Sequence, residues 1–298
     1  MAFTDKTDHT ELKDPVIGHL VGGKIHIARL LAQGSFGNVY HGQHVEKRAP
    51  CAVKVIDLMS SRSDEQLDIA VNEVDALRKL SALPNVATLE EVESVNDQIF
   101  ICSEYCGNTS LQTLVHRFQY RGLPASLHRH VSRSLLRTVA AVHSKGVAHC
   151  DIKLDNILLV PDGVRLIDFG SAWVAGRSNL TQLGAVAFRS PETLYEGFVL
   201  DNHSARLIDS WGVGLSLLCA ATGAFPFDGA SVYQLIESIK RVNLDDILLD
   251  IEDSPLAEML RGLLSPAHER WSVERALKSR YVRGGSGVFR RLAGVIGL

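Results

Sequence analysis

The spacing of apolar residues in this 298-residue chain changes near Gly107, and this change constrains the fold most strongly. Before Gly107, short runs rich in β-branched and aromatic residues alternate with turn residues, which is typical of antiparallel strands. After Gly107, apolar residues recur at helical spacing, most clearly over residues 124–146. One face of that predicted helix carries Leu127, Val131, Leu135, Val139 and Val142. The sequence therefore predicts a small β-rich lobe followed by a larger helical lobe.

The first lobe should contain five antiparallel strands and one helix. The helix is expected over residues 63–80, and the pair Asn96-Asp97 is expected to form the turn between the last two strands. The predicted apolar stripe of the helix consists of Leu67, Val71, Val74, Leu77 and Leu80. The predicted strands are residues 25–31, 38–45, 51–58, 85–94 and 98–105.

These elements predict an α+β fold with two lobes. A chain of this length with 46% hydrophobic residues can bury a large core. We expect an N-terminal extension or loosely attached arm over residues 1–24 and a small lobe with its connecting segment over 25–107. The large lobe is expected over residues 108–283, followed by a C-terminal tail over 284–298.

Charge and cysteine content exclude several classes of protein. The 31 Lys and Arg against 34 Asp and Glu give a net charge of −3, so nothing favours nucleic acid as a partner. The five scattered cysteines form no C-x-x-C pair, which predicts reduced, mostly buried thiols. No apolar stretch reaches the roughly 20 residues of a transmembrane helix, and the N-terminus lacks the apolar region of a signal peptide. We therefore expect a cytoplasmic or nuclear chain without a transmembrane segment.

A glycine-rich segment and a lysine fall within the predicted strands. The segment "LLAQGSFGNVYHG" could let backbone N–H groups approach phosphate oxygens, although a simple hairpin turn would also need its glycines. Lys54 lies on an otherwise apolar strand, where a buried ammonium needs an anionic partner. Glu73 on the predicted helix could supply that charge, and the pair could hold nucleotide phosphates. The alternative is an edge lysine whose ammonium reaches water.

The stretch "HCDIKLDN" and the residues after it carry groups suited to phosphoryl transfer. A predicted hairpin with a turn at residues 161–163 brings this loop beside Asp168. Asn156 and Asp168 offer oxygen ligands for Mg²⁺, and Lys153 offers a positive charge to a phosphoryl group. Asp151 can orient or deprotonate an attacking hydroxyl. These residues predict a catalytic loop.

Taken in order, these motifs resemble those of the eukaryotic-type protein kinase family over roughly residues 25 to 283. "CAVK" is similar to the family's strand motif V-A-I-K, "HCDIKLDN" to its catalytic loop, and Asp168-Phe169-Gly170 to its D-F-G. Lys153 lies two residues after the aspartate, and a lysine at this position resembles the pattern of Ser/Thr kinases rather than that of Tyr kinases. The resemblance implies the two-lobed kinase fold, with ATP and Mg²⁺ as cofactors. It also implies a nucleotide site formed by Gln33, Gly34, Ser35, Phe36, Gly37, Val39, Ala52, Lys54, Glu73, Glu104 and Cys106.

The resemblance extends beyond the site itself. Ser190-Pro191-Glu192 is similar to the family's A-P-E, and Arg270 stands where the family pairs an arginine with that glutamate. Asp209 would then brace the backbone of the catalytic loop.

Three positions depart from the family pattern. Ala32 replaces the first glycine of the loop, and Cys150 replaces the arginine that precedes the catalytic aspartate. In many relatives that arginine pairs with a phosphorylated activation loop, so this form of regulation is not expected. Ala185 stands where Ser/Thr kinases commonly place a threonine that contacts the catalytic aspartate and lysine.

Two functions remain open from the sequence. The first is an ATP-dependent kinase that acts as a monomer and phosphorylates Ser or Thr hydroxyls of a protein substrate. Such a kinase would be either constitutively active or controlled by a regulatory protein partner. The second is a pseudokinase or weakly active nucleotide-binding scaffold, for which Ala32, Cys150 and Ala185 would be early marks of decay. The presence of Lys54, Asp151 and Asp168 favours the enzyme.

Overall fold

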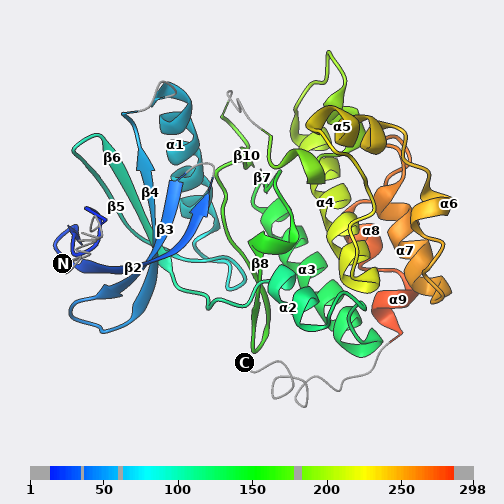
Figure 1. Ribbon diagram of the computed structural model, residues 1–298, viewed down its shortest axis with the longest axis horizontal. Coiled ribbons are helices and arrows are strands. Elements are labelled where there is room, and N and C mark those ends of the chain that lie inside the picture. The colour runs from blue at the N-terminus through cyan, green and yellow to red at the C-terminus, as the bar shows by residue number, and fades with distance from the viewer. Residues whose placement is uncertain (1–13, 35–36, 60–62, 178–182, 285–298) are drawn as a thin grey trace, which may run out of the picture. The chain divides into compact units, whose positions relative to one another are not determined.

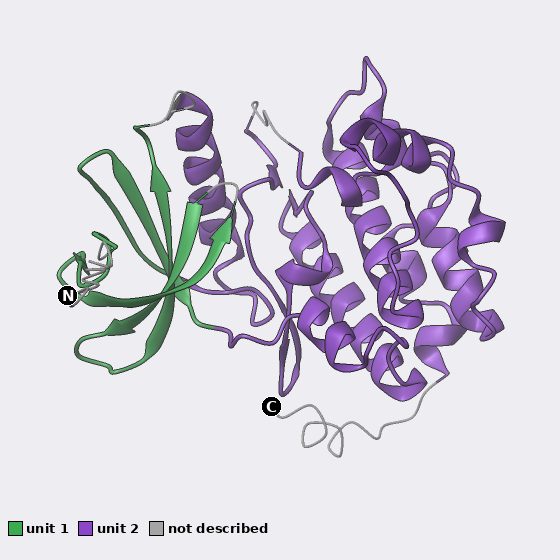
Figure 2. Cartoon of the chain, in the orientation of Figure 1, with its two compact units in different colours: residues 1–63, 90–105 green, residues 64–89, 106–298 purple. Residues whose placement is uncertain are grey.

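The computed structural model describes residues 14–34, 37–59, 63–177 and 183–284. The chain forms two compact units, coloured separately in Figure 2. The first, called the sheet unit here, comprises residues 1–63 and 90–105. The second, the helical unit, comprises residues 64–89 and 106–298. The predicted α+β composition, with a sheet-forming part and a mainly helical part, is confirmed.

The sheet unit contains a sheet with strand order β1-β2-β3-β4-β6-β5 (Figure 1). The strand pairs β1–β2, β2–β3, β3–β4 and β4–β6 are antiparallel. The hairpin between the last two strands turns at Asn96 and Asp97, which have φ angles of 49° and 56° and confirm the predicted turn. The strands are β1 (Leu20–Val21), β2 (Ile25–Gly34), β3 (Gly37–His44), β4 (Pro50–Asp57), β5 (Leu89–Val95) and β6 (Gln98–Glu104).

β1 is a short sixth strand that the sequence analysis did not predict. It lies within residues 1–24, which were expected to be an extension or a loosely attached arm. The described part of this segment is attached: Val16 and Val21 are buried in the core of the sheet unit, and Tyr40 donates a hydrogen bond to the Asp14 carboxylate at 2.8 Å. Burial of apolar side chains and pairing with β2 explain the difference.

The helical unit is built around two long helices, α3 and α4, which contact each other. The predicted apolar face of α3 is confirmed, because its five members are all buried. α4 begins with a capping box at Asp201 and ends at Gly223, whose φ of 78° favours glycine. Trp211 of α4 is fully buried. The α-helices are α1 (Ser63–Leu80), α2 (Leu111–Arg117), α3 (Ala125–Ser144), α4 (Asn202–Thr222), α5 (Val232–Lys240), α6 (Leu244–Ile247), α7 (Ser254–Leu264), α8 (Val273–Ala276) and α9 (Arg280–Arg283).

Short elements complete the helical unit. Two of its two-stranded sheets flank the loop described below. The strands are β7 (Val147–Ala148), β8 (Ile157–Val160), β9 (Gly163–Leu166) and β10 (Trp173–Val174). The 3₁₀ turns are η1 (Leu154–Asn156), η2 (Val186–Phe188) and η3 (Pro191–Leu194).

α1 has the predicted bounds, but its neighbours and its buried face differ from the prediction. Residues 64–89 group with the helical unit, although the sequence analysis assigned them to the small lobe. Leu67 and Val71, predicted to be in the buried stripe, are 43% and 39% exposed. The face that is buried instead includes the polar side chains of Asn72 and Glu73. The buried face of the helix differs from the predicted one because these polar groups face the segment after residue 168.

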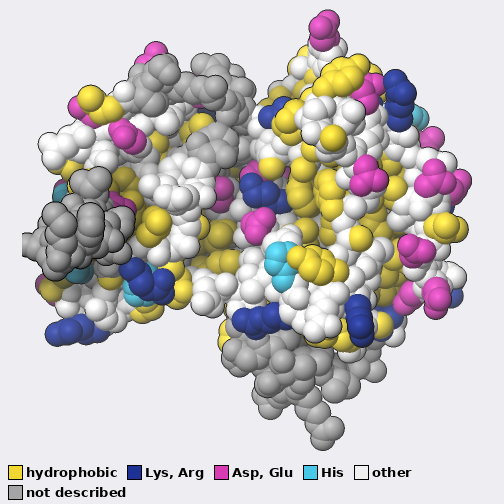
Figure 3. Space-filling view, viewed as in Figure 1, with side chains coloured by type: hydrophobic (Ala, Val, Ile, Leu, Met, Phe, Trp, Pro, Cys, Tyr) yellow, Lys and Arg dark blue, Asp and Glu magenta, His cyan; other side chains and the backbone are white. Residues whose placement is uncertain are grey.

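The distribution of charge on the surface and the burial of the cysteines agree with what the composition predicts. Acidic and basic side chains are interspersed on the face shown in Figure 3. All five cysteines are buried, as predicted, and none of the five forms a disulfide in the structure. Among the residues that the structure describes, no helix is both long and apolar enough to cross a membrane.

Candidate active site

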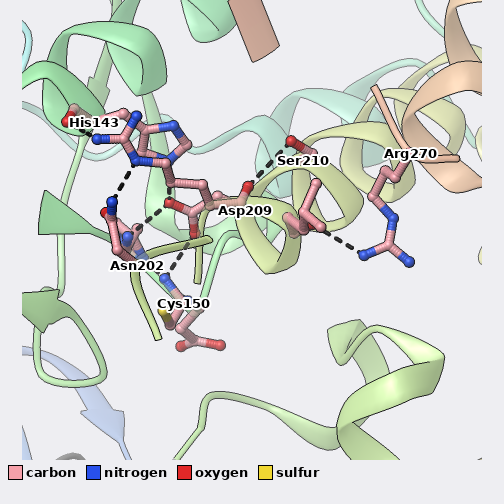
Figure 4. Close-up of polar contacts among 10 residues, drawn as sticks. His143, Cys150, Asn202, Asp209, Ser210 and Arg270 are labelled. Atoms are coloured by element: carbon pink, nitrogen blue, oxygen red, sulfur yellow. Dashed lines mark hydrogen bonds and ion pairs between the residues drawn. The ribbon is translucent and has the colours of Figure 1, made fainter. Parts of the chain in front are cut away.

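A buried carboxylate on α4 holds the loop that follows β7. Asp209 accepts hydrogen bonds from the backbone N–H groups of His149 at 2.8 Å and Cys150 at 2.7 Å. The same carboxylate contacts Nε2 of His143 at 2.8 Å (Figure 4). Cys150 adopts a φ of 58°, which allows two successive N–H groups to reach one carboxylate. The role expected of Asp209 as a brace of this loop is thus confirmed.

The carboxylate of Asp151 is held from both of its oxygens. Lys153 Nζ lies 2.7 Å from Oδ2, and Asn156 Nδ2 donates to Oδ2 at 3.2 Å and to the Asp151 carbonyl at 2.9 Å. The backbone N–H of Ala185 donates to Oδ1 at 2.8 Å. The side chain of Asp151 is only 3% exposed. The structure therefore brings three of the predicted site residues, Asp151, Lys153 and Asn156, into one hydrogen-bonded group.

Gly184 and Ala185 approach Asp151 very closely. A Cβ atom on Gly184 would lie 2.1 Å from Asp151 Oδ1, so only glycine fits there. Ala185 lacks the hydroxyl that the family commonly places at this position, but its main-chain N–H supplies a hydrogen bond to the carboxylate. A backbone donor does not depend on the side chain, so the sequence could not show this contact.

The β8–β9 hairpin links the loop to Asp168, as predicted. The backbone N–H of Ile167 donates to the Asn156 carbonyl at 3.2 Å, and His149 Nε2 lies 2.9 Å from the Ile167 carbonyl. The ring of His149 also packs against Phe169, with centroids 4.6 Å apart. Asp168 itself has a φ of 63°, a conformation rare for a residue with a side chain. These contacts fix the direction in which the backbone leaves Asp168.

Glu73 of α1 lies beside Gly170, near Asp168. A Cβ atom placed on Gly170 would be 3.6 Å from both Asp168 Oδ1 and Glu73 Oε2. The neighbouring Asn72 donates from Nδ2 to the carbonyls of Gly170 at 3.1 Å and Ala172 at 2.7 Å. The sequence analysis missed Asn72. The one feature of the sequence that could have identified Asn72 is its position next to Glu73. In the structure Asn72 lies on the same side of the helix as the buried residues Ile69 and Ala70.

The other predicted nucleotide-site residues of the first lobe lie on the sheet unit. Val39 pairs with Lys54, and Ala52 pairs with Ser103, so these residues face the same side of the sheet. Val39, Ala52 and Lys54 are half-buried, whereas Cys51, Val53 and Val55 on the opposite side form the core. The strands thus present the predicted residues on the side that the core leaves accessible.

The glycine-rich segment is partly described. Gln33 and Gly34 lie exposed at the end of β2, and Gly37 begins β3. Gly37 has a φ of 137°, and a Cβ atom there would lie 2.4 Å from the Val55 carbonyl oxygen, so the turn requires glycine. Ser35 and Phe36 lie outside the described residues.

Two residues of the predicted nucleotide site, Glu104 and Cys106, lie where the chain passes from one unit to the other. Glu104 ends β6 in the sheet unit and pairs with Cys51, whereas Cys106 is assigned to the helical unit. Cys106 is buried with Ala87 and Leu158. The thiol is thus packed among apolar side chains, as the sequence analysis expected.

An ion pair predicted from the resemblance is present in the helical unit. The Arg270 guanidinium contacts the two carboxylate oxygens of Glu192 at 2.5 and 2.9 Å. Arg270 also donates to the carbonyls of Leu207 at 3.1 Å and Ser265 at 3.0 Å. This bidentate pair anchors the segment after Ala185 to α4 and α7.

Comparison with known proteins adds independent information. A family model described as the protein kinase domain matches residues 25–282. The human "hormonally up-regulated neu tumor-associated kinase" is 28% identical over 277 residues, which cover 88% of this chain and 37% of that protein. The rat "serine/threonine-protein kinase STK11" is 29% identical over 273 residues, covering 88% of this chain and 61% of that protein. The chain therefore spans less than two thirds of the length of these curated relatives.

Proposed function

Because the chain belongs to the protein kinase family, we propose that it transfers the γ-phosphoryl group of ATP to Ser or Thr hydroxyls of protein substrates. The single observation that supports this most directly is the restrained carboxylate of Asp151. The rat relative is named a serine/threonine-protein kinase, which supports the choice of Ser or Thr as the acceptor.

The hydrogen bonds of Asp151 leave capacity for a substrate. An ionised carboxylate offers about four lone-pair sites, and Lys153, Asn156 and the Ala185 N–H occupy three of them. The remaining site can accept the hydrogen bond of a Ser or Thr hydroxyl. In this position Asp151 would orient the hydroxyl oxygen toward the γ-phosphorus. It would receive the hydroxyl proton as the new O–P bond forms and the bond from the γ-phosphorus to the bridging oxygen of ADP breaks, so that ADP leaves with the electron pair of that bond.

The donor atoms of the helical unit fit a magnesium ion bound with ATP. Asn156 directs its amide nitrogen toward Asp151, so its amide oxygen is the atom that could bind a metal ion. Asn156 and Asp168 would therefore hold the ion through oxygen atoms, which Mg²⁺ prefers. When bound, the ion neutralises negative charge on the phosphate oxygens.

Charged residues of both units support transfer in this proposal. Lys153 carries its ammonium next to Asp151 and would contact the transferring phosphoryl group. Lys54 of the sheet unit would hold the α- and β-phosphates, as the resemblance to the family implies. Val39 and Ala52 provide apolar surface on the same side of the sheet for the purine.

The decisive experiment measures transfer of labelled γ-phosphate from Mg·ATP to a generic basic protein. We expect Asp151→Asn to lower the rate by about 10²–10⁴-fold, because the amide cannot accept the proton. Asp155→Asn is the matched control, because Asp155 is exposed in the same loop. That variant should keep the wild-type rate. Lys54→Met should also abolish transfer.

The outcome separates the enzyme from the scaffold. Wild-type protein that gains thermal stability from ATP but transfers no label would support the nucleotide-binding scaffold. Equal activity in wild type and Asp151→Asn would show that Asp151 is not the catalytic base.

A further inference from the structure

Arg189 follows the 3₁₀ turn η2 and reaches back across it. Its Nε donates to the Gly184 carbonyl at 2.9 Å, and its Nη2 donates to the Leu183 carbonyl at 2.7 Å. The guanidinium thus joins Arg189 to the backbone of residues 183 and 184, at the other end of a segment of seven residues. A planar fork can hold two successive carbonyls in a fixed direction, which a single ammonium cannot do.

No acidic side chain among the described residues forms an ion pair with Arg189. The hydrogen bonds of its guanidinium go to neutral carbonyls. Burial lowers the pKa of the guanidinium, and the nearby negative charge of Asp151 opposes this effect. A half-buried cation therefore stabilises one particular path of the backbone.

That path leads directly to the candidate catalytic base. Gly184, whose carbonyl Arg189 holds, packs against the Asp151 carboxylate with no room for a Cβ atom. The next N–H, that of Ala185, donates to Asp151 Oδ1. Asp151, Ala185 and Arg189 also line one small crevice. A shift of the Gly184 peptide would therefore move the donor that fixes Asp151.

We propose that Arg189 is a positioning residue for catalysis, which holds the 183–185 backbone so that the Ala185 N–H orients the Asp151 carboxylate. The proposal deepens the proposed kinase function and rests on it for its effect on rate. It explains how the chain fixes Asp151 although position 185 has no side-chain hydroxyl. Arg189 acts through the backbone and does not itself touch the reacting atoms.

The first test compares the kinetics of Arg189→Gln and Arg189→Lys with the wild type. We expect Arg189→Gln to lower kcat about 10–100-fold, because a small displacement of a catalytic group costs this much. The KM for ATP should stay within about twofold. Arg189→Lys should retain an intermediate kcat, because lysine keeps the charge but can bond only one carbonyl well. Arg241→Gln, which removes an exposed arginine from the end of α5, should behave as wild type.

The second test does not require catalysis. Hydrogen exchange of the Ala185 amide, followed by NMR, should be at least about 10-fold faster in Arg189→Gln than in wild type or Arg241→Gln. If the wild type transfers no phosphate, the proposed function fails, and amide exchange alone decides the role of Arg189. Unchanged exchange of Ala185 would overturn the proposal, as would a kcat for Arg189→Gln within twofold of the wild type.

Discussion

Arg270 shows how one enclosed side chain can connect several segments. Its side chain is fully buried, and it binds Glu192, the Leu207 carbonyl and the Ser265 carbonyl. The guanidinium carbon also lies 5.2 Å from the centre of the Trp211 ring. A buried cation of this kind depends on its anionic partner, because an unpaired charge in the interior is strongly unfavourable.

Replacement of Glu192 by Gln should therefore destabilise the protein by about 3 kcal/mol at pH 7. Burial raises the pKa of Glu192, but the hydrogen bonds and charge of Arg270 outweigh it and hold that pKa below its ordinary value of 4.5. The stabilisation is therefore present above about pH 4.5 and is lost as the pH falls through the lower, folded-state pKa. Urea unfolding at pH 7 and at pH 4 or below should show the difference between the two proteins narrowing.

The matched control for this prediction is Glu196→Gln, because Glu196 is exposed four residues further along the chain. This variant should unfold as the wild type does at each pH. A constant difference between wild type and Glu192→Gln at all pH values would contradict the assigned ion pair.

At the residue scale, the sequence predicted contacts made by side chains and missed contacts made by the backbone. Asp151, Lys153, Asn156 and Asp209 could be identified because their side chains stand at fixed positions in a motif. The sequence indicated that Ala185 loses a contact with Asp151, because the missing hydroxyl is visible in the sequence. The main-chain N–H that makes a contact instead is not visible there. Only the folded path of the chain shows that this N–H reaches Asp151.

At the scale of the element, α1 shows why a correct helix can have a wrongly predicted face. The bounds were predicted correctly, because the apolar spacing is helical over residues 63–80. The prediction that Leu67 and Val71 are buried was wrong, because it considered only the spacing of apolar residues. The buried face is instead set by Asn72, whose partners lie about 100 residues away. Contacts at that separation leave no periodic signal.

We expect Asn72→Asp to loosen the attachment of α1 to the segment after Gly170. A carboxylate has no N–H to donate and would face two carbonyl oxygens, at a cost of about 1–3 kcal/mol. In a chain of this size the thermal midpoint should fall by several degrees. Hydrogen exchange of residues 170–177 should become faster. Asp68→Asn, on the exposed side of α1, should leave both measurements unchanged, and equal effects of the two substitutions would refute the role of Asn72.

At the scale of the whole molecule, the order of the elements could be predicted but their grouping could not. The change from strands to helices near Gly107 is local information. The assignment of residues 64–89 to the helical unit depends on long-range contacts. Besides those of Asn72, these include an ion pair between Asp75 and Arg177 at 2.7 Å and a hydrogen bond from Lys79 to the Ala175 carbonyl at 3.1 Å. Each contact joins a polar side chain to a partner that no spacing rule identifies.

The interior of the helical unit should also make global stability depend on pH. His128 of α3 is buried, with Nε2 2.9 Å from the Leu217 carbonyl of α4 and Nδ1 2.6 Å from the Tyr281 hydroxyl of α9. Burial lowers the pKa of His128 to about 4 from an ordinary value of 6.5. Between these values the unfolded chain binds a proton that the folded protein does not, so stability should decrease as the pH falls.

Protonation of His128 in the unfolded chain alone should lower the free energy of unfolding by about 3 kcal/mol between pH 6.5 and pH 4. His128→Gln should be less stable at pH 7, because it disturbs a packed hydrogen-bond network, but its stability should fall less steeply with acid. His130, whose pKa burial also lowers to about 4, is present in both proteins and cancels in the comparison. His268→Gln, at a side chain that is 78% exposed, should retain the wild-type slope. Urea unfolding at a series of pH values measures these slopes, and an equal slope in His128→Gln and wild type would show that His128 does not cause the acid sensitivity.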